Sequence, residues 1–148
     1  MANTLVLHGP NLNLLGEREP DIYGNLSLAE IDRRIAAIGS KLGFTIRCYQ
    51  SNSEGALIDA LHEARQWANG IIFNPGGYTH TSVALHDAIL AIKIPVVEVH
   101  LSNPQVREDF RHRSLIAPVC IGTIAGFGWK SYELAIYALQ WYLDNNNG

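Results

Sequence analysis

Ile71-Ile72-Phe73 is a short run of apolar residues with no polar position in it. A strand of this kind is covered on both faces, which is typical of a parallel sheet between two layers of helices. The flanking segments agree, because we predict a helix over residues 54–67, capped by Asn52 or Ser53, and another over 81–91. Apolar residues run almost all the way round the predicted helix 81–91, which indicates that this helix is buried against something besides its own sheet.

The same alternation of short apolar runs and segments of helical period extends through the rest of the chain. Ser27 and Glu30 form a capping box, and the apolar residues that follow recur at i, i+3 and i+4 until Gly43. Residues 9–25 are rich in Gly, Pro and Asn and form a long loop, a length that indicates a functional role. The predicted strands are residues 4–8, 44–49, 71–73, 95–99 and 119–124, and the predicted helices are 28–42, 54–67, 81–91 and 131–143.

Five strands that alternate with helices predict βαβ units and an all-parallel sheet. Right-handed crossovers place helices on both faces, and the strand order 2-1-3-4-5 of the flavodoxin-like fold satisfies this requirement. The sequence therefore predicts an α/β, three-layer sandwich. Residues 1–148 are expected to form a single domain, because no repeat, linker or low-complexity segment divides them.

Composition limits the classes of function. Apolar residues make up 47% of the 148 residues and charged residues 17%, as in a globular protein. The net charge is −3 and no basic stripe is present, which argues against a nucleic-acid partner. No apolar run reaches the roughly 18 residues that cross a bilayer, and no basic stretch precedes the first apolar run. We expect a cytoplasmic protein in which Cys48 and Cys120 are reduced thiols in the core.

Polar and glycine residues concentrate in three segments at the ends of the first, third and fourth predicted strands. In a sheet of order 2-1-3-4-5, ligands bind outside the carboxyl ends of the strands, near the switch between strands one and three. The three loops are therefore expected to meet at one pocket. They comprise residues 9–13, 74–80 and 98–103.

Glu98 and His100 alternate along the fourth strand and so point to the same side. A carboxylate beside an imidazole keeps the proton on it, which suits a general acid, although a hydrogen-bonded histidine at a strand end is the alternative. Asn74, with Gly76 and Gly77, offers an amide and a backbone that can approach a ligand, or simply a tight turn.

His80 and Asp87 are seven residues apart and would share one face of a helix that held both, although such a surface pair is often only structural. Any arginine that lines the pocket, such as Arg18 or Arg111, would favour an anionic substrate. For Arg107 and Arg113 we expect a solvated position instead.

Tyr23 lies in the loop 9–25 and could be a packing residue, or a base if a neighbouring arginine lowered its pKa. The sequence has no G-x-G-x-x-G motif before a helix, no Walker A loop, no zinc-ligand spacing and no G-x-S-x-G elbow. Catalysis without a cofactor or a metal is therefore the expectation.

Several long motifs, in order along nearly the whole chain, are similar to those of the type II 3-dehydroquinate dehydratases. They are Leu7-His8-Gly9-Pro10-Asn11-Leu12-Asn13-Leu14-Leu15-Gly16, Arg18-Glu19-Pro20, Tyr23-Gly24, Asn74-Pro75-Gly76-Gly77-Tyr78-Thr79-His80-Thr81-Ser82, Glu98-Val99-His100-Leu101-Ser102-Asn103 and the segment from Glu108-Asp109-Phe110-Arg111 to Ser114. The resemblance implies a lyase that dehydrates 3-dehydroquinate to 3-dehydroshikimate through an enolate, in the shikimate pathway or in quinate catabolism.

The same resemblance implies a role for each matching residue. Tyr23 would remove the C2 proton, Arg18 would hold Tyr23 as tyrosinate, Asn11 would position a water at the enolate oxygen, and His100, oriented by Glu98, would protonate the departing C1 hydroxyl. The residues that would bind substrate are Asn74, Gly76, Gly77, His80, Arg111 and the backbone amides of Leu101 and Ser102.

The resemblance also implies a lid that carries Arg18 and Tyr23, and a dodecamer that is a tetramer of trimers. In that assembly Asp87 would reach a neighbour's active site. Two alternatives remain open from the sequence: a non-enzymatic flavodoxin-like module that binds a flavin or a phosphorylated ligand, and a different lyase or isomerase on the same scaffold.

Overall fold

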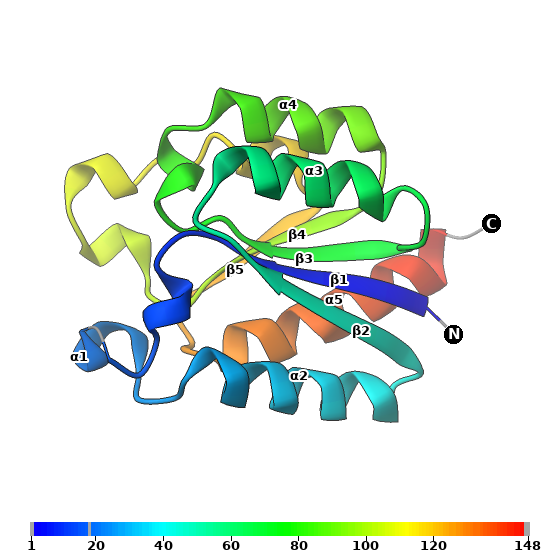
Figure 1. The fold of residues 1–148 in the computed structure, drawn as a ribbon, viewed down its shortest axis with the longest axis horizontal. Coiled ribbons are helices and arrows are strands. Elements are labelled where there is room, and N and C mark those ends of the chain that lie inside the picture. The colour runs from blue at the N-terminus through cyan, green and yellow to red at the C-terminus, as the bar shows by residue number, and fades with distance from the viewer. Residues whose placement is uncertain (1, 18, 147–148) are drawn as a thin grey trace.

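The structure, a computed structural model, describes residues 2–17 and 19–146. Five strands form one parallel sheet in the order β2-β1-β3-β4-β5 (Figure 1). This order confirms the predicted flavodoxin-like topology. The strands are β1 Ala2–His8, β2 Phe44–Gln50, β3 Gly70–Asn74, β4 Val96–His100 and β5 Gly122–Ala125.

Helices cover both faces of the sheet, as right-handed crossovers require. α2 (Leu28–Lys41) and α5 (Lys130–Asn146) pack on one face, and α3 (Glu54–Ala64) and α4 (Val83–Ile92) on the other (Figure 1). Every residue of β3 is buried, in agreement with its apolar sequence. The sheet thus divides the core into two apolar layers, and only its edges and ends remain open to a ligand.

Serine side chains fix where three of the helices begin. The hydroxyls of Ser27, Ser53 and Ser82 accept hydrogen bonds from backbone N–H groups in the first turns of α2, α3 and α4. Such caps satisfy donors that the helix itself leaves unpaired. Ser53, and not Asn52, is therefore the cap of α3.

Several predicted boundaries differ from the structure by a few residues, and two of these differences have a clear local cause. The helix predicted to begin at residue 81 begins at Val83, because Ser82 is extended and caps it. The strand predicted from residue 119 begins at Gly122, because Ala117–Val119 form a 3-10 turn that contains Pro118. The loop 9–25 contains the 3-10 turn Leu12–Leu14 and the one-turn helix α1 (Pro20–Tyr23).

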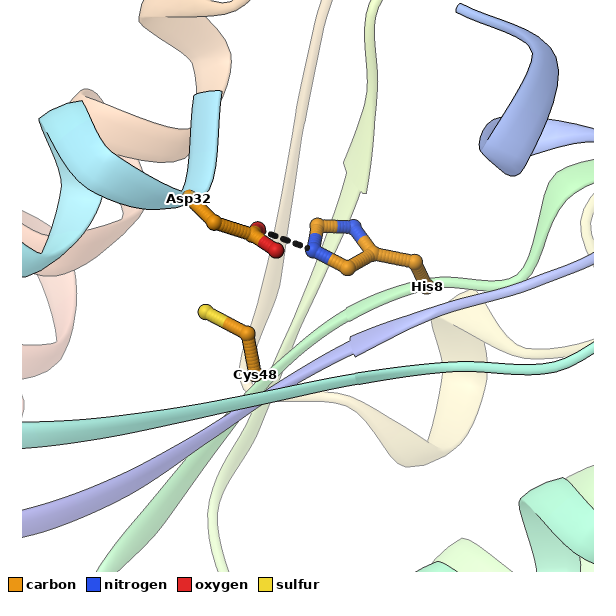
Figure 2. A group of neighbouring side chains, drawn as sticks. All are labelled: His8, Asp32 and Cys48. Carbon is orange, nitrogen blue, oxygen red and sulfur yellow. Dashed lines mark hydrogen bonds and ion pairs between the residues drawn. The ribbon is translucent and has the colours of Figure 1, made fainter. Parts of the chain in front are cut away.

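The two cysteines are free thiols. The prediction that both lie in the core is wrong for Cys48, whereas Cys120 packs against the core from a partly buried position. Cys48 is a largely exposed residue of the edge strand β2, but its thiol is directed toward Asp32 of α2 and is partly covered there (Figure 2). Cys120 is half-buried just before β5. Among the described residues, no helix has both the length and the hydropathy needed to cross a bilayer.

Candidate active site

A cavity of about 140 Å³ opens at the carboxyl ends of β1, β3 and β4, where the three polar loops were expected to meet. This space is roughly ten times what one water molecule needs. The cavity is lined by Pro10, Asn11, Leu12, Asn74, Gly76, Gly77, His80, His100, Leu101, Ser102, Pro104, Arg107 and Arg111. Segments more than 60 residues apart in the chain therefore share one small-molecule site.

The loops after β1 and β3 pack backbone against backbone at the edge of the cavity. The N–H of Gly9 donates to the carbonyl of Asn74 over 2.7 Å. A Cβ at Gly9 would lie 2.4 Å from the carbonyl oxygen of Pro75, so only glycine permits this contact. The next residues turn sharply, with Asn11 in the left-handed region at φ 70° and its N–H donating to the side chain of Asn52.

Asn74, the last residue of β3, is almost completely buried, yet it lines the cavity. Its Oδ1 accepts from the N–H of Gly76 at 3.1 Å, and its Nδ2 donates to the hydroxyl of Tyr132 at 3.1 Å. The adjacent His80 donates through Nδ1 to the carbonyl of Arg113 at 2.8 Å. Both polar side chains are thus held in fixed orientations at the cavity wall.

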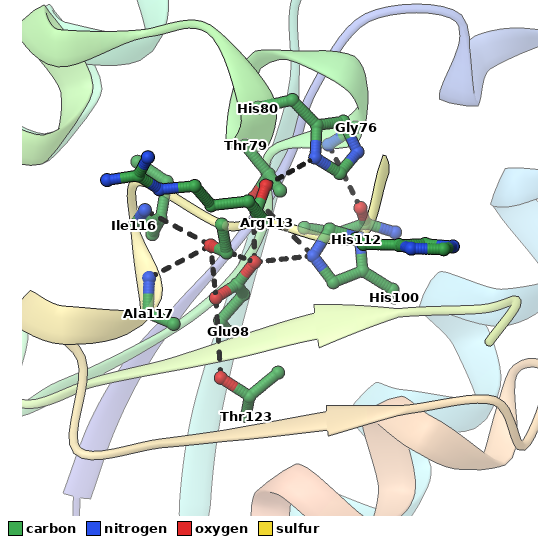
Figure 3. Close-up of polar contacts among 12 residues, drawn as sticks. Gly76, Thr79, His80, Glu98, His100, His112, Arg113, Ile116, Ala117 and Thr123 are labelled. Atoms are coloured by element: carbon green, nitrogen blue, oxygen red, sulfur yellow. Dashed lines mark hydrogen bonds and ion pairs between the residues drawn. The ribbon is translucent and has the colours of Figure 1, made fainter. Parts of the chain in front are cut away.

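Glu98 is a fully buried carboxylate beneath the cavity (Figure 3). Its Oε2 lies 2.5 Å from Nε2 of His100 and accepts from Thr79 at 2.7 Å, and both carboxylate oxygens accept from Ser114 at 3.0 Å. Thr123 of β5 donates to Oε1 at 3.3 Å. Each lone-pair region of the carboxylate therefore faces a donor, as a buried charge requires.

The hydrogen bonds on Glu98 decide its ionisation. Burial by itself raises the pKa of the carboxyl, but the hydrogen bond and charge of His100, with the hydroxyls of Thr79 and Ser114, outweigh burial and lower the pKa. Glu98 is consequently a carboxylate at neutral pH. Because this carboxylate can only accept a hydrogen bond, the Nε2 atom of His100 that faces it carries a hydrogen.

Among the described residues, His100 uses only one of its two ring nitrogens, Nε2, in hydrogen bonds. Its side chain is nearly buried and lines the cavity wall, and within residues 2–17 and 19–146 no protein group hydrogen-bonds Nδ1. A purely structural histidine at a strand end would have both nitrogens satisfied. The arrangement instead suits a histidine that exchanges a proton with a bound molecule.

Two arginines supply positive charge at the mouth of the cavity. Arg111 pairs with Glu108 and lies over the ring of Phe110. Arg107 lines the cavity and donates to Ser102 Oγ at 3.3 Å, so the prediction that it is solvated is wrong. The 3-10 turns Pro104–Val106 and Asp109–Arg111 fold this segment back over the site, which no sequence period indicates. Arg113 is exposed, as expected.

The condition under which His80 and Asp87 would share one helical face is not met. His80 ends the 3-10 turn Gly76–His80, whereas Asp87 belongs to α4, and the extended Ser82 separates the two elements. The Asp87 side chain is 69% exposed and contacts only its neighbour His86 among the described ion pairs. It does not line the cavity of its own chain.

Two predicted catalytic residues cannot be placed. Arg18 lies outside the described residues, and so does the side chain of Tyr23, although the backbone of Tyr23 ends α1. Sequence pattern alone indicated no role for Thr79, Ser114 or Thr123, whose hydroxyls hold Glu98. Thr79 and Ser114 lie within the family's motifs. Thr123 does not, and it is identified only by its pairing with Glu98 across β4 and β5.

Comparison with known proteins gives a single family. Residues 2–140 match the family described as dehydroquinase class II. The chain belongs to this family. The 3-dehydroquinate dehydratase of Rhizobium etli is 59% identical over 95% of this chain and 97% of that protein. That of Gloeothece citriformis is 57% identical over 97% of this chain and 96% of its own.

Solved structures agree with the family assignment. The crystal structure of a type II dehydroquinase from Butyrivibrio crossotus has a TM-score of 0.92 and 46% identity, and it covers 93% of this chain and 97% of that one. The family predicted from the sequence motifs is thereby confirmed. Membership of a dehydroquinase family also favours an enzyme over a flavin-binding module.

Proposed function

We propose that this protein is a 3-dehydroquinate dehydratase, which converts 3-dehydroquinate to 3-dehydroshikimate by eliminating water without a cofactor. The family and the names of the relatives support the substrate and the reaction. The observation that carries the proposal is the pair beside the cavity: an ionised, fully buried Glu98 holds His100, which lines the cavity and whose Nδ1 has no partner among the described protein groups. Residues 1–148 would constitute one catalytic domain.

The lining of the cavity is suited to a small, hydroxylated anion. Arg111 and Arg107 provide positive charge for a carboxylate, and arginine binds carboxylates through two parallel hydrogen bonds. Asn74 and His80, with the backbone amides of Leu101 and Ser102, provide donors and acceptors for hydroxyl groups. Gly76 and Gly77 leave room for the ligand to approach the backbone.

The proposed chemistry is an anti elimination in two steps. Tyr23, kept as tyrosinate by Arg18, removes the C2 proton, and the electron pair of that bond forms an enolate with the C3 carbonyl. Asn11 positions a water that stabilises the enolate oxygen. The enolate then expels the C1 hydroxyl, which takes a proton from His100 and leaves as water. Glu98 stabilises the imidazolium before this transfer and restores its orientation afterwards.

We also propose the assembly that the sequence resemblance implies, a dodecamer built from four trimers. In its support, Val83 and Leu90 of α4 are more than 60% exposed although both are apolar. Asp87 lies on the same helix, where it would reach the active site of a neighbour. Light scattering should give a mass far above the 16.3 kDa of one chain, and a clean monomer would contradict the assembly.

A continuous ultraviolet assay with 3-dehydroquinate tests the reaction directly, because the product is a conjugated enone and the substrate is not. Absorbance should rise with enzyme concentration and should be unaffected by a chelator. His100→Ala, purified in the same way, is the matched control for contaminating activity. If the wild-type protein, folded by circular dichroism, produced no more enone than this control, the proposed function would be wrong.

A further inference from the structure

A hydrogen-bonded chain runs from the cavity wall through the core to the surface of α2. Asn74 Nδ2 donates to the hydroxyl of Tyr132, which lies 2.8 Å from Nδ1 of His8, and Nε2 of His8 lies 2.8 Å from Asp32 (Figure 2). His8 and Tyr132 are fully buried, and the Asp32 side chain is 30% exposed. The catalytic steps proposed above use neither His8 nor Tyr132.

The direction of each hydrogen bond in this chain follows from one group that can only donate. The backbone N–H of Gly76 donates to Oδ1 of Asn74, so the Asn74 atom facing Tyr132 is the Nδ2 donor. The hydroxyl of Tyr132 therefore accepts from Asn74. Burial raises the pKa of Tyr132, so its hydroxyl keeps a hydrogen that needs an acceptor.

The acceptor for the Tyr132 hydrogen is Nδ1 of His8, because the Asn74 atom facing the hydroxyl is a donor. Nδ1 must then carry a lone pair, and the ring hydrogen resides on Nε2, from which it is donated to Asp32. Any other arrangement leaves a buried hydroxyl hydrogen unsatisfied, which costs roughly 1–3 kcal/mol. The hydrogen bonds therefore all donate in one direction, from Asn74 through Tyr132 and His8 to Asp32.

We propose that His8 is a positioning residue, a neutral Nε2–H tautomer whose bond to Tyr132 orients the Asn74 amide toward the substrate. With Oδ1 held by Gly76 and one Nδ2 hydrogen held by Tyr132, the remaining polar capacity of Asn74 is directed to the cavity that it lines. The inference rests on the proposed function, in which Asn74 binds the substrate. It extends that function to residues that do not line the cavity.

The same geometry argues against a metal site at His8. Ligand atoms of His8, Asp32 and Cys48 lie within 4.8 Å of one another (Figure 2). A metal bound to Nε2 would need the lone pair of that nitrogen, so the ring hydrogen of His8 would have to move to Nδ1. The Tyr132 oxygen would then face two donors, Nδ1–H of His8 and Nδ2–H of Asn74. The hydroxyl hydrogen of Tyr132 would have no acceptor. Partial burial, and next the charge of Asp32, also raise the pKa of Cys48, so it remains a thiol at neutral pH.

The tautomer can be measured without any substrate. Solid-state NMR of the whole assembly, labelled with ¹⁵N-histidine, should give for His8 at pH 7 a lone-pair nitrogen at Nδ1 and an N–H nitrogen at Nε2. The chain has six histidines, and the spectrum of His8→Phe identifies the His8 signals by difference. A hydrogen on Nδ1 would overturn the proposal. So would stoichiometric zinc binding by the wild type that Cys48→Ala abolishes.

Kinetics then test the consequence for Asn74. Tyr132→Phe and His8→Phe should each raise KM about tenfold while kcat changes less than threefold, because a binding group loses its orientation and the proton transfers keep theirs. Asp32→Leu should raise KM to a smaller extent, and Asp32→Asn should recover most of the loss because its amide oxygen still accepts from Nε2–H. Tyr137→Phe, at a half-exposed position of α5, the helix that also holds Tyr132, is the matched control.

The two proposals fail separately. A wild-type protein that makes no enone refutes the dehydratase, whereas the NMR experiment still tests the tautomer. The other outcome is an active wild type together with folded Tyr132→Phe and His8→Phe proteins whose KM is unchanged and whose melting temperatures alone are lower. This result would show that the hydrogen-bonded chain merely stabilises the core. Because each variant removes a buried hydrogen bond, the melting temperature of each is measured first, and the kinetics are run well below it.

Discussion

Among the described residues, two buried histidines, His100 and His8, each contact a carboxylate, and they differ in what the second ring nitrogen does. His100 contacts Glu98 through Nε2, and no described protein group binds its Nδ1, which leaves that nitrogen for the cavity. His8 contacts Asp32 through Nε2, and Nδ1 is bound to Tyr132. A histidine beside a carboxylate is therefore not by itself a mark of catalysis. Proton transfer to a ligand needs one nitrogen that the protein leaves unpaired.

The carboxylates also differ. Glu98 is fully buried and accepts from three hydroxyls besides His100, whereas the Asp32 side chain is 30% exposed. A charge that is completely withdrawn from water and completely hydrogen-bonded has a fixed position, which suits a group that must orient a proton donor. Asp32 is partly in contact with water and accepts from His8 at the far end of a hydrogen-bonded chain.

His100→Ala should break the comparison most strongly. Because this variant removes the proposed acid, kcat should fall by about 10²–10⁴, the usual contribution of general acid–base catalysis. The ultraviolet assay measures the loss, and circular dichroism should show an intact fold. His8→Phe is the counterpart, with its effect on KM instead. Equal losses of kcat in the two variants would erase the distinction between the pairs.

Tyr23→Phe tests the other proton transfer, to which neither histidine pair contributes. If Tyr23 is the base, kcat should fall by on the order of 10²–10⁴ while the substrate still binds. Tyr49→Phe, an exposed tyrosine on β2, is the control and should have near-normal turnover. Turnover of Tyr23→Phe within a fewfold of the wild type would remove Tyr23 from the mechanism and leave the base unidentified.

The sequence predicted those parts of the fold and site that depend on local pattern. The apolar runs and helical periods gave five strands and their order, and the alternation along β4 placed Glu98 beside His100. Sequence pattern could not assign a role to His8, although His8 lies in one of the family's motifs. The reason is that its partners, Asp32 and Tyr132, are 24 and 124 residues away in the sequence. Contacts at such separations depend on how the helices pack across the sheet.

Loop conformation was the other feature that sequence pattern did not determine. Arg107 was expected in solvent, but two 3-10 turns bring it over the cavity. No single helix holds both His80 and Asp87, because the 3-10 turn ends at His80 and the extended Ser82 caps α4. Short turns of this kind are set by capping bonds and packing, and neither gives a periodic signal.

Glu98→Gln sharpens the comparison of the two carboxylates through the dependence of stability on pH. The pKa of Glu98 is lowered by folding, so its contribution to stability is fully present above the ordinary pKa of an unfolded glutamic acid and is lost as pH falls through the folded pKa. Denaturant unfolding at several pH values between 3 and 6 should show a steeper acid loss for wild type than for Glu98→Gln. Parallel curves would mean that Glu98 is not held as a carboxylate in the folded protein.

Arg107→Met and Arg113→Met should give the smallest effects, and they test the cavity mouth against the nearby surface. Arg107 lines the cavity and donates to Ser102, whereas Arg113 is exposed and contributes only its carbonyl, to His80. Methionine preserves most of the apolar stem of each side chain and removes the charge. We expect KM for the anionic substrate to rise about three- to tenfold for Arg107→Met, the range for one hydrogen bond that involves a charge at a partly solvated site, and to stay within twofold for Arg113→Met. If both variants raised KM equally, the effect would come from the general field of the cations, and the position of Arg107 over the cavity would have no specific role.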